Sequence, residues 1–161
     1  MTERRLITSY AAYETMTRQT QAILVLFLIS VTACTYHTSK QKPMMAAASA
    51  AEFAQVAFVE QNIDRAFSML DPEFQAYATK EKFVEGITNM NKPTAPRVVT
   101  ATEFEPIPGQ EGINIYLTGA RDTEKFYYRI PMKGSEEKGY KAAGVFRNLG
   151  PYPSSGSRQP L

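Results

Sequence analysis

Cysteine, histidine and tryptophan are nearly absent from these 161 residues: the chain has one Cys, one His and no Trp. A single cysteine excludes an intrachain disulfide and a zinc site built from several thiolates. The one histidine, His37, lies in the polar stretch TYHTSKQKP, so the chain beyond that stretch has no imidazole. Catalytic sites of the Ser-His-Asp or Cys-His kind are therefore excluded from that part. We expect no cofactor and no metal site.

An excess of charge of one sign is also missing. The chain has 18 Lys and Arg against 16 Asp and Glu, a net charge of +2, and the basic residues are scattered. Without a basic stripe that neutralises a row of phosphates, nucleic acid is excluded as the expected partner. Apolar residues make up 43% of the chain, which is enough for one ordinary folded core.

The chain has no apolar run long enough to span a membrane. Residues 22–33, AILVLFLISVTA, form a run of 12 residues without a charge. A helix of that length covers about 18 Å, short of the roughly 30 Å hydrocarbon core of a bilayer. The length suits the apolar region of a secretory signal, with Arg18 before it. We expect residues 1–33 to be a signal peptide, with Met16 as the true start and an N-terminal extension as the alternative.

The most specific motif closes this run. Val31, Thr32, Ala33 and Cys34 resemble the lipobox of bacterial lipoproteins, which has an aliphatic residue, two small residues and a cysteine. In that family the thiol receives a diacylglyceryl group and the signal is cut before it. The resemblance implies lipid attachment at Cys34 and the membrane as a partner. The residue after the cysteine is Thr35 and not Asp. In the enterobacterial members of the family, this pattern implies transfer to the periplasmic face of the outer membrane.

Two alternatives to lipidation stay open: plain secretion after an ordinary small-residue cleavage site, and an uncleaved anchor. An accidental Cys34 would leave a free thiol in an oxidising compartment, where it is a liability. The position of the only cysteine therefore favours lipidation, and two or more acyl chains hold a protein stably on a membrane. We expect residues 34–43 to be a lipidated tether and the protein to lie in the bacterial cell envelope.

The next stretch is helical in pattern. From Met44 to Leu70, apolar residues recur at three- and four-residue steps, which predicts one long helix. Asp71 before a proline predicts a cap and a short second helix over 73–79. Thr79 predicts the cap of a third helix that ends at Met90.

The second half changes to the alternation of strands. We expect four strands, at residues 98–104, 113–119, 124–132 and 140–148. Helices followed by a run of antiparallel strands give an α+β domain, here residues 44–150, with the helices on one face of the sheet. The final residues, 151–161, are expected to be a disordered tail.

This order of elements resembles the nuclear transport factor 2-like cone, and most closely the small bacterial lipoproteins and secreted domains of unknown function with that fold. The residues that carry the likeness are AFVEQNIDRAFSMLDPEFQAYATKEKF (57–83) and EKGYKAAGVFRN (137–148). The likeness implies a curved four-stranded sheet around the long helix, with a pocket at its open end. Some relatives are enzymes, such as ketosteroid isomerases and scytalone dehydratases, and others only bind. Many pair through the sheet, so a homodimer is an open alternative.

In the enzymatic relatives, acids, tyrosines or histidines line the cone. The catalytic candidates that the likeness implies here are Asp64, Asp71, Tyr116, Tyr127, Tyr128 and Tyr140, of which Asp64, Tyr116 and Tyr128 form the proposed acid–tyrosine set. A carboxylate among aromatic rings has a raised pKa and can act as a base, while a tyrosine hydroxyl holds an oxyanion.

Ordinary structural roles account for the same residues. Asp64 falls on the polar side of the predicted helix, Asp71 is explained as a cap, and strand tyrosines commonly pack with the hydroxyl in water. We therefore expect no catalytic residue, and a non-enzymatic domain that binds an envelope protein or a small apolar ligand. The alternative is a cone enzyme that acts on a small hydrophobic substrate through an acid–tyrosine pair.

Overall fold

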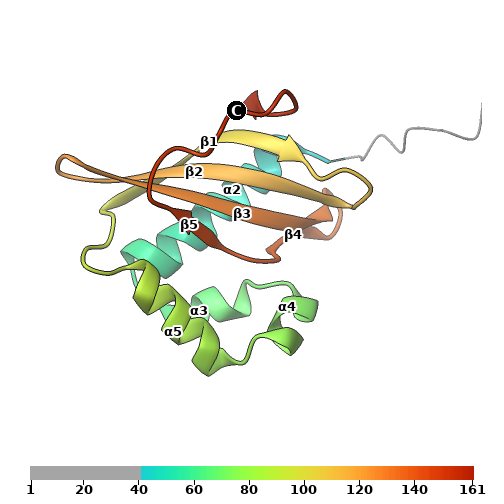
Figure 1. The fold of residues 1–161 in the computed structure, drawn as a ribbon. Helices are drawn as coiled ribbons and strands as arrows, with labels where there is room; N and C mark the ends of the chain where they lie inside the picture. The colour runs from blue at the N-terminus through green and yellow to red at the C-terminus, as the bar shows by residue number, and fades with distance from the viewer. Residues whose placement is uncertain (1–40) are drawn as a thin grey trace, which may run out of the picture. The chain divides into compact units, whose positions relative to one another are not determined.

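The computed structural model describes residues 41–161, so the predicted signal peptide, the lipobox with Cys34 and nearly all of the tether lie outside the described residues. The described part is an α+β domain with several short helices and an antiparallel sheet (Figure 1). The helices are α2 (Pro43–Ala54), the π-helical turn η1 (Gln55–Val59), α3 (Ile63–Ser68), α4 (Pro72–Tyr77) and α5 (Lys80–Met90). None of these described helices is long and apolar enough to cross a membrane.

The strands are β1 (Val98–Pro106), β2 (Gly112–Arg121), β3 (Glu124–Ser135), β4 (Gly139–Ala142), β5 (Phe146–Asn148) and β6 (Gln159–Pro160). They form one sheet in the order β4-β3-β2-β1-β6, and β5 also pairs with β3. Each of these strand pairs is antiparallel. The helix α2 lies across one face of this sheet (Figure 1).

The prediction of one helix from Met44 to Leu70 is wrong, because the helical path ends at Val59. Gln61 adopts a positive φ of 54°, which an α-helix cannot accommodate. Asn62 then starts α3 as its cap, since its side chain accepts a hydrogen bond from the Arg65 N–H at 3.1 Å. Both predicted caps are confirmed: Asp71 accepts from the Glu73 N–H, and Thr79 accepts from the Lys82 N–H.

The last predicted strand, 140–148, is split into β4 and β5. Both pair with β3, β4 at residues 132–135 and β5 at residues 127–129. Pro131 lies between these two stretches of β3, and it has no N–H to donate to a neighbouring strand. Its carbonyl instead accepts from the Ala143 N–H at 2.8 Å, in the connection between the two short strands.

The prediction of a disordered tail also differs from the structure. The C-terminal residues return to the sheet, where Gln159 and Pro160 pair with Phe104 and Glu103 of β1. The Leu161 N–H donates to the Thr102 carbonyl at 3.1 Å. This segment crosses the face of the sheet opposite to α2 (Figure 1).

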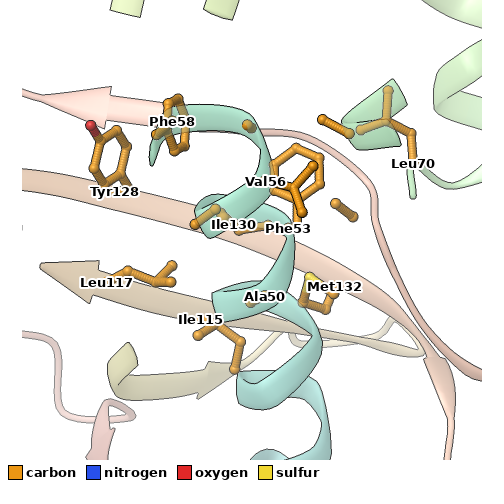
Figure 2. Close-up of a cluster of buried hydrophobic side chains, with 14 of the residues drawn as sticks. Ala50, Phe53, Val56, Phe58, Leu70, Ile115, Leu117, Tyr128, Ile130 and Met132 are labelled. Atoms are coloured by element: carbon orange, nitrogen blue, oxygen red, sulfur yellow. The ribbon is translucent and has the colours of Figure 1, made fainter. Parts of the chain in front are cut away.

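The core lies between α2 and the sheet (Figure 2). Small side chains on α2, among them Ala46, Ala50 and Ala54, are fully buried and let the helix lie close to the strands. The fully buried large residues include Phe53, Phe58, Ile115, Ile130, Met132 and Tyr128. These side chains fill the layer between the helix and the strands.

Candidate functional site

The structure does not bring the three predicted catalytic candidates together. Tyr128 on β3 pairs with Leu117 on β2, and both side chains face the helix. Tyr116 directly precedes Leu117 on β2, so its side chain points to the opposite face of the sheet. The Asp64 side chain is 81% exposed and forms an ion pair with Lys80 at 2.8 Å. Its carboxylate is therefore bonded to a lysine and to neither tyrosine. The structure therefore does not assemble these three residues into one acid–tyrosine site.

Tyr128 is a core residue. It is fully buried, and its ring stacks on Phe58 with 4.3 Å between the ring centroids (Figure 2). Its hydroxyl has no hydrogen-bond partner within residues 41–161. Burial raises the pKa of this phenol to about 12. A substrate that entered this site would have to displace the stacked ring.

The remaining candidates have structural roles. Asp71 caps α4, with 3.1 Å between its Oδ1 and the Glu73 nitrogen. The Tyr140 hydroxyl accepts a hydrogen bond from the Lys42 N–H at 2.8 Å, which fixes the first residues of the domain to β4. Tyr127 is half-buried on β3, where it pairs with Thr118. The Asp71 cap is a local contact that the sequence predicts, whereas the contact of Tyr140 with Lys42 joins residues distant in the chain and has no local signal.

A cavity of about 230 Å³ lies where α2 meets β3 and β4. Phe53, Met69, Met132 and Ala142 supply its apolar lining. Ser49, Glu52, Tyr140 and Lys141 supply polar groups to the same lining, and the cavity is partly open to solvent. The volume admits one small molecule, and the methionine side chains can adapt to its shape.

The acid and the tyrosine at this cavity are already bonded to other groups. Glu52 accepts a hydrogen bond from the Arg65 guanidinium at 2.7 Å, and Tyr140 is bonded to Lys42 as described above. Both groups are therefore engaged in contacts that hold neighbouring segments of the chain together.

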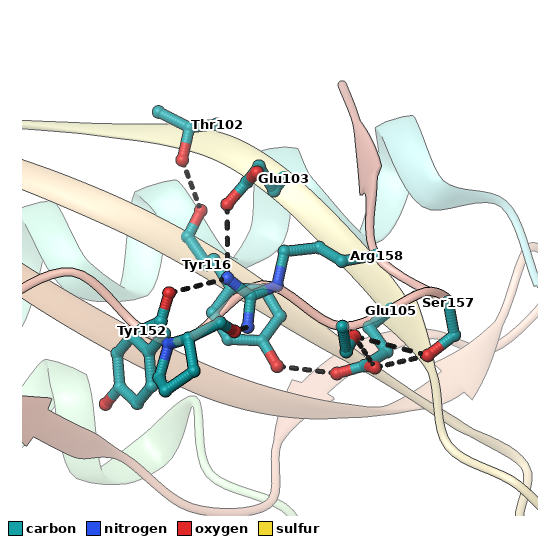
Figure 3. Close-up of polar contacts among 9 residues, drawn as sticks. Thr102, Glu103, Glu105, Tyr116, Tyr152, Ser157 and Arg158 are labelled. Carbon is teal, nitrogen blue, oxygen red and sulfur yellow. Dashed lines mark hydrogen bonds and ion pairs between the residues drawn. The ribbon is translucent and has the colours of Figure 1, made fainter.

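A polar cluster lies on the opposite face of the sheet, beneath the C-terminal segment (Figure 3). We call residues 149–161 the strap, and the surface formed by Glu103, Glu105 and Tyr116 the shelf. Arg158 of the strap lies over the Tyr116 ring, 3.8 Å from its centroid, and its side chain is only 9% exposed.

Arg158 also fastens the strap to itself and to the shelf. Its guanidinium donates to the carbonyls of Tyr152 and Pro153, at 3.2 Å and 2.7 Å. It forms an ion pair with Glu103 at 3.5 Å. A planar guanidinium suits this arrangement, because it stacks on a ring while its edges donate hydrogen bonds.

Glu105 is the second fixed point of the shelf. Its carboxylate accepts hydrogen bonds from the hydroxyls of Ser155, Ser157 and Tyr116, the last at 2.6 Å. These donors favour the charged form and lower the pKa of Glu105 to about 2, with Ser155 the largest cause. The carboxylate stays ionised and acts as an acceptor.

Sequence reasoning missed the strap and the shelf because PYPSSGSRQPL has no hydrophobic periodicity. The only signal was the presence of Tyr152 and Arg158, two side chains that pack well against a sheet. Tyr152 contacts Tyr116 edge-on, with 5.4 Å between the centroids.

Within residues 41–161, no group of three or more His, Cys, Asp or Glu side chains is placed to hold a metal ion. Comparisons of the chain with models of protein families, with curated proteins and with solved structures return no match.

Proposed function

We propose that the chain is a bacterial lipoprotein, held in the cell envelope by a lipid on Cys34, whose folded domain binds a partner or a small apolar ligand and catalyses no reaction. The lipid anchor is inferred from the motif Val31–Cys34 at the end of the apolar run. The Thr35 that follows favours the periplasmic face of the outer membrane.

The position at which the domain begins supports this proposal. Lys42 is fixed to Tyr140 through its N–H, and its ammonium group forms an ion pair with Glu136 at 3.4 Å. Lys42 follows Cys34 by only eight positions, a reach of about 26 Å when fully extended. A lipid on Cys34 would hold the domain, and the end that carries Tyr140, close to the membrane surface.

A binding role fits the interior better than catalysis does. The core is filled by aromatic and aliphatic side chains, and the predicted acid–tyrosine set is dispersed over two faces. The cavity beside Phe53, Met69 and Met132 has room for a small apolar group. The enzyme alternative has no comparable feature in its favour.

The finer fold is part of the same proposal. Helices on one face of an antiparallel sheet, in the order helices then strands, support a relation to the nuclear transport factor 2-like cone. A homodimer through the sheet, as many cones form, would need the strap to leave the face that it covers. Light scattering that gives a monomeric mass would rule that dimer out.

Membrane fractionation tests the anchor. We expect the unaltered protein to sediment with membranes and to partition into detergent, and Cys34→Ser to be lost from both fractions. His37→Ser is the matched control, because it changes a residue three positions on and leaves the lipobox intact. Equal membrane association of Cys34→Ser and the unaltered protein would contradict the anchor.

Methionine methyl NMR tests the ligand site with benzene as the probe. The methyl signals of Met69 and Met132 should shift and saturate during the titration, because both residues line the cavity. Met44 is the control, since it is 68% exposed and lies outside the cavity lining. If all three signals stay unchanged, the cavity does not bind a small apolar group.

A further inference from the structure

The strap is held by polar contacts, whereas the helices are held by apolar burial. Its attachments are the Arg158 stack and ion pair, the serine hydroxyls on Glu105 and two residue pairs with β1. Its leucines contribute little, since Leu149 is 99% exposed and Leu161 is 36% exposed, and its main apolar contact is the Tyr152 ring against Tyr116. Segments with little apolar burial open at low free-energy cost.

The strap uses the same contacts as an extended peptide bound to the edge of a sheet. Gln159 and Pro160 add a short strand to β1, and Leu161 continues the pairing through its N–H to Thr102. Backbone pairing at a free strand edge together with pockets for side chains is a recurrent mode of peptide recognition. Here the chain's own end takes the place of that peptide.

The charges of the shelf select the chemistry of a competing peptide. Glu103 and Glu105 lie two residues apart on β1, and both carboxylates face the strap. The Tyr116 ring links the two carboxylates: it stacks on Arg158, which is paired with Glu103, and its hydroxyl donates a hydrogen bond to Glu105. Two carboxylates beside an aromatic face attract a guanidinium.

We propose that the shelf along β1 is a docking site for an extended basic peptide of a partner protein, and that the strap occupies this site in the free chain. The partner's segment would pair with the β1 edge, place an arginine over Tyr116 between the two carboxylates, and displace residues 149–161. The strap thereby acts as a built-in competitor. A tethered competitor has an effective concentration of about 1 mM, so only a peptide with additional contacts would displace it fully.

Fluorescence anisotropy with a labelled peptide of residues 149–161 tests the proposal. The receptor is the full chain carrying Arg158→Ala, which weakens the strap and leaves the shelf unchanged. A second receptor is the chain ending at Asn148. Both should bind the peptide saturably below about 1 mM, and the unaltered chain should bind it more weakly because its own strap competes. A peptide with Arg158→Ala should bind about tenfold more weakly than the natural one.

A shelf variant supplies the matched control. Glu103→Gln with Glu105→Gln, placed in the Arg158→Ala chain, removes both carboxylates and should reduce binding of the natural peptide by about tenfold as well. Near-ultraviolet circular dichroism of each receptor reports whether the core remains folded. The proposal is overturned if neither folded receptor binds the peptide, if both peptides bind equally, or if both receptors unfold, since the strap would then be an integral part of the fold.

Discussion

The guanidinium of Arg158 lies 3.8 Å from the centroid of the Tyr116 ring and fastens the C-terminal strap to the sheet. Arg158→Lys keeps the charge but loses the planar stack and the paired donation to the Tyr152 and Pro153 carbonyls. We expect a loss of about 1 kcal/mol in the free energy of unfolding. Hydrogen exchange at Leu161 should become faster, because its N–H depends on the strap staying in place.

Arg97→Lys is the control for this change. Arg97 pairs with Asp122 at 3.0 Å, and both side chains are 68% exposed. An exposed pair contributes little, so the substitution should alter stability by less than about 0.5 kcal/mol. Equal effects of the two substitutions in chemical denaturation would show that the stacking on Tyr116 contributes no stability.

Tyr128→Phe should leave stability unchanged or raise it. The Tyr128 hydroxyl is buried without a hydrogen-bond partner among the described residues, so its removal relieves a desolvation cost. Tyr116→Phe is the matched control on the opposite face, because it removes a hydrogen bond to Glu105. We expect that control to cost about 1 kcal/mol. Thermal unfolding measures both variants. If Tyr128→Phe lowers the melting temperature more than Tyr116→Phe does, the buried Tyr128 hydroxyl has a partner or a function.

Gly134→Ala should destabilise the β3–β4 hairpin strongly. Gly134 has a φ of 137°, and an added Cβ would meet the Gly139 carbonyl oxygen at 2.0 Å. The clash is with backbone, so the expected cost is about 3 kcal/mol or more. Gly86→Ala is the control: it lies in α5, where no described atom beyond the adjoining residues and backbone of the helix comes within 4 Å of the new Cβ.

The control should stabilise the protein by about 0.5–1 kcal/mol, because alanine favours a helix over glycine. Urea unfolding of the two variants measures both effects on one scale. A Gly134→Ala protein as stable as the unaltered one would contradict the hairpin geometry.

The hydrogen bonds to Glu105 predict an acid-sensitive strap. The pKa of Glu105 is about 2 in the folded protein and 4.5 ordinarily, so its contribution is complete above pH 4.5. Stability is then lost as the pH falls from 4.5 towards 2, where the folded state also takes up the proton. The difference in unfolding free energy between the unaltered protein and Glu105→Gln should shrink over that range. A difference that stays constant from pH 5 to pH 2 would show that no such pKa shift exists.

The local signals in the sequence predicted local structure well. Asp71 and Thr79 cap the helices that they were expected to cap, because an N-cap acts on backbone only two or three residues away. The alternation of residues 113–119 likewise predicted the buried face of β2, with Ile113, Ile115 and Leu117 inside. The α+β class followed from these patterns.

The features that leave no mark on the hydrophobic pattern could not be predicted. The break after Val59 rests on Gln61 and its positive φ, and the split between β4 and β5 follows from Pro131 on a neighbouring strand. The strap is ordered by Tyr116 and Glu105, about forty to fifty residues earlier in the chain. A hydrophobic pattern holds no information on such pairings, since polar and stacking contacts carry them.

The intact mass of the mature protein extracted from membranes tests the central claim most directly. We predict a chain that begins at Cys34 and carries the added mass of a diacylglyceryl group, with Cys34→Ser lacking this species. An unmodified chain that begins at another residue would contradict the lipoprotein assignment and the envelope location proposed with it.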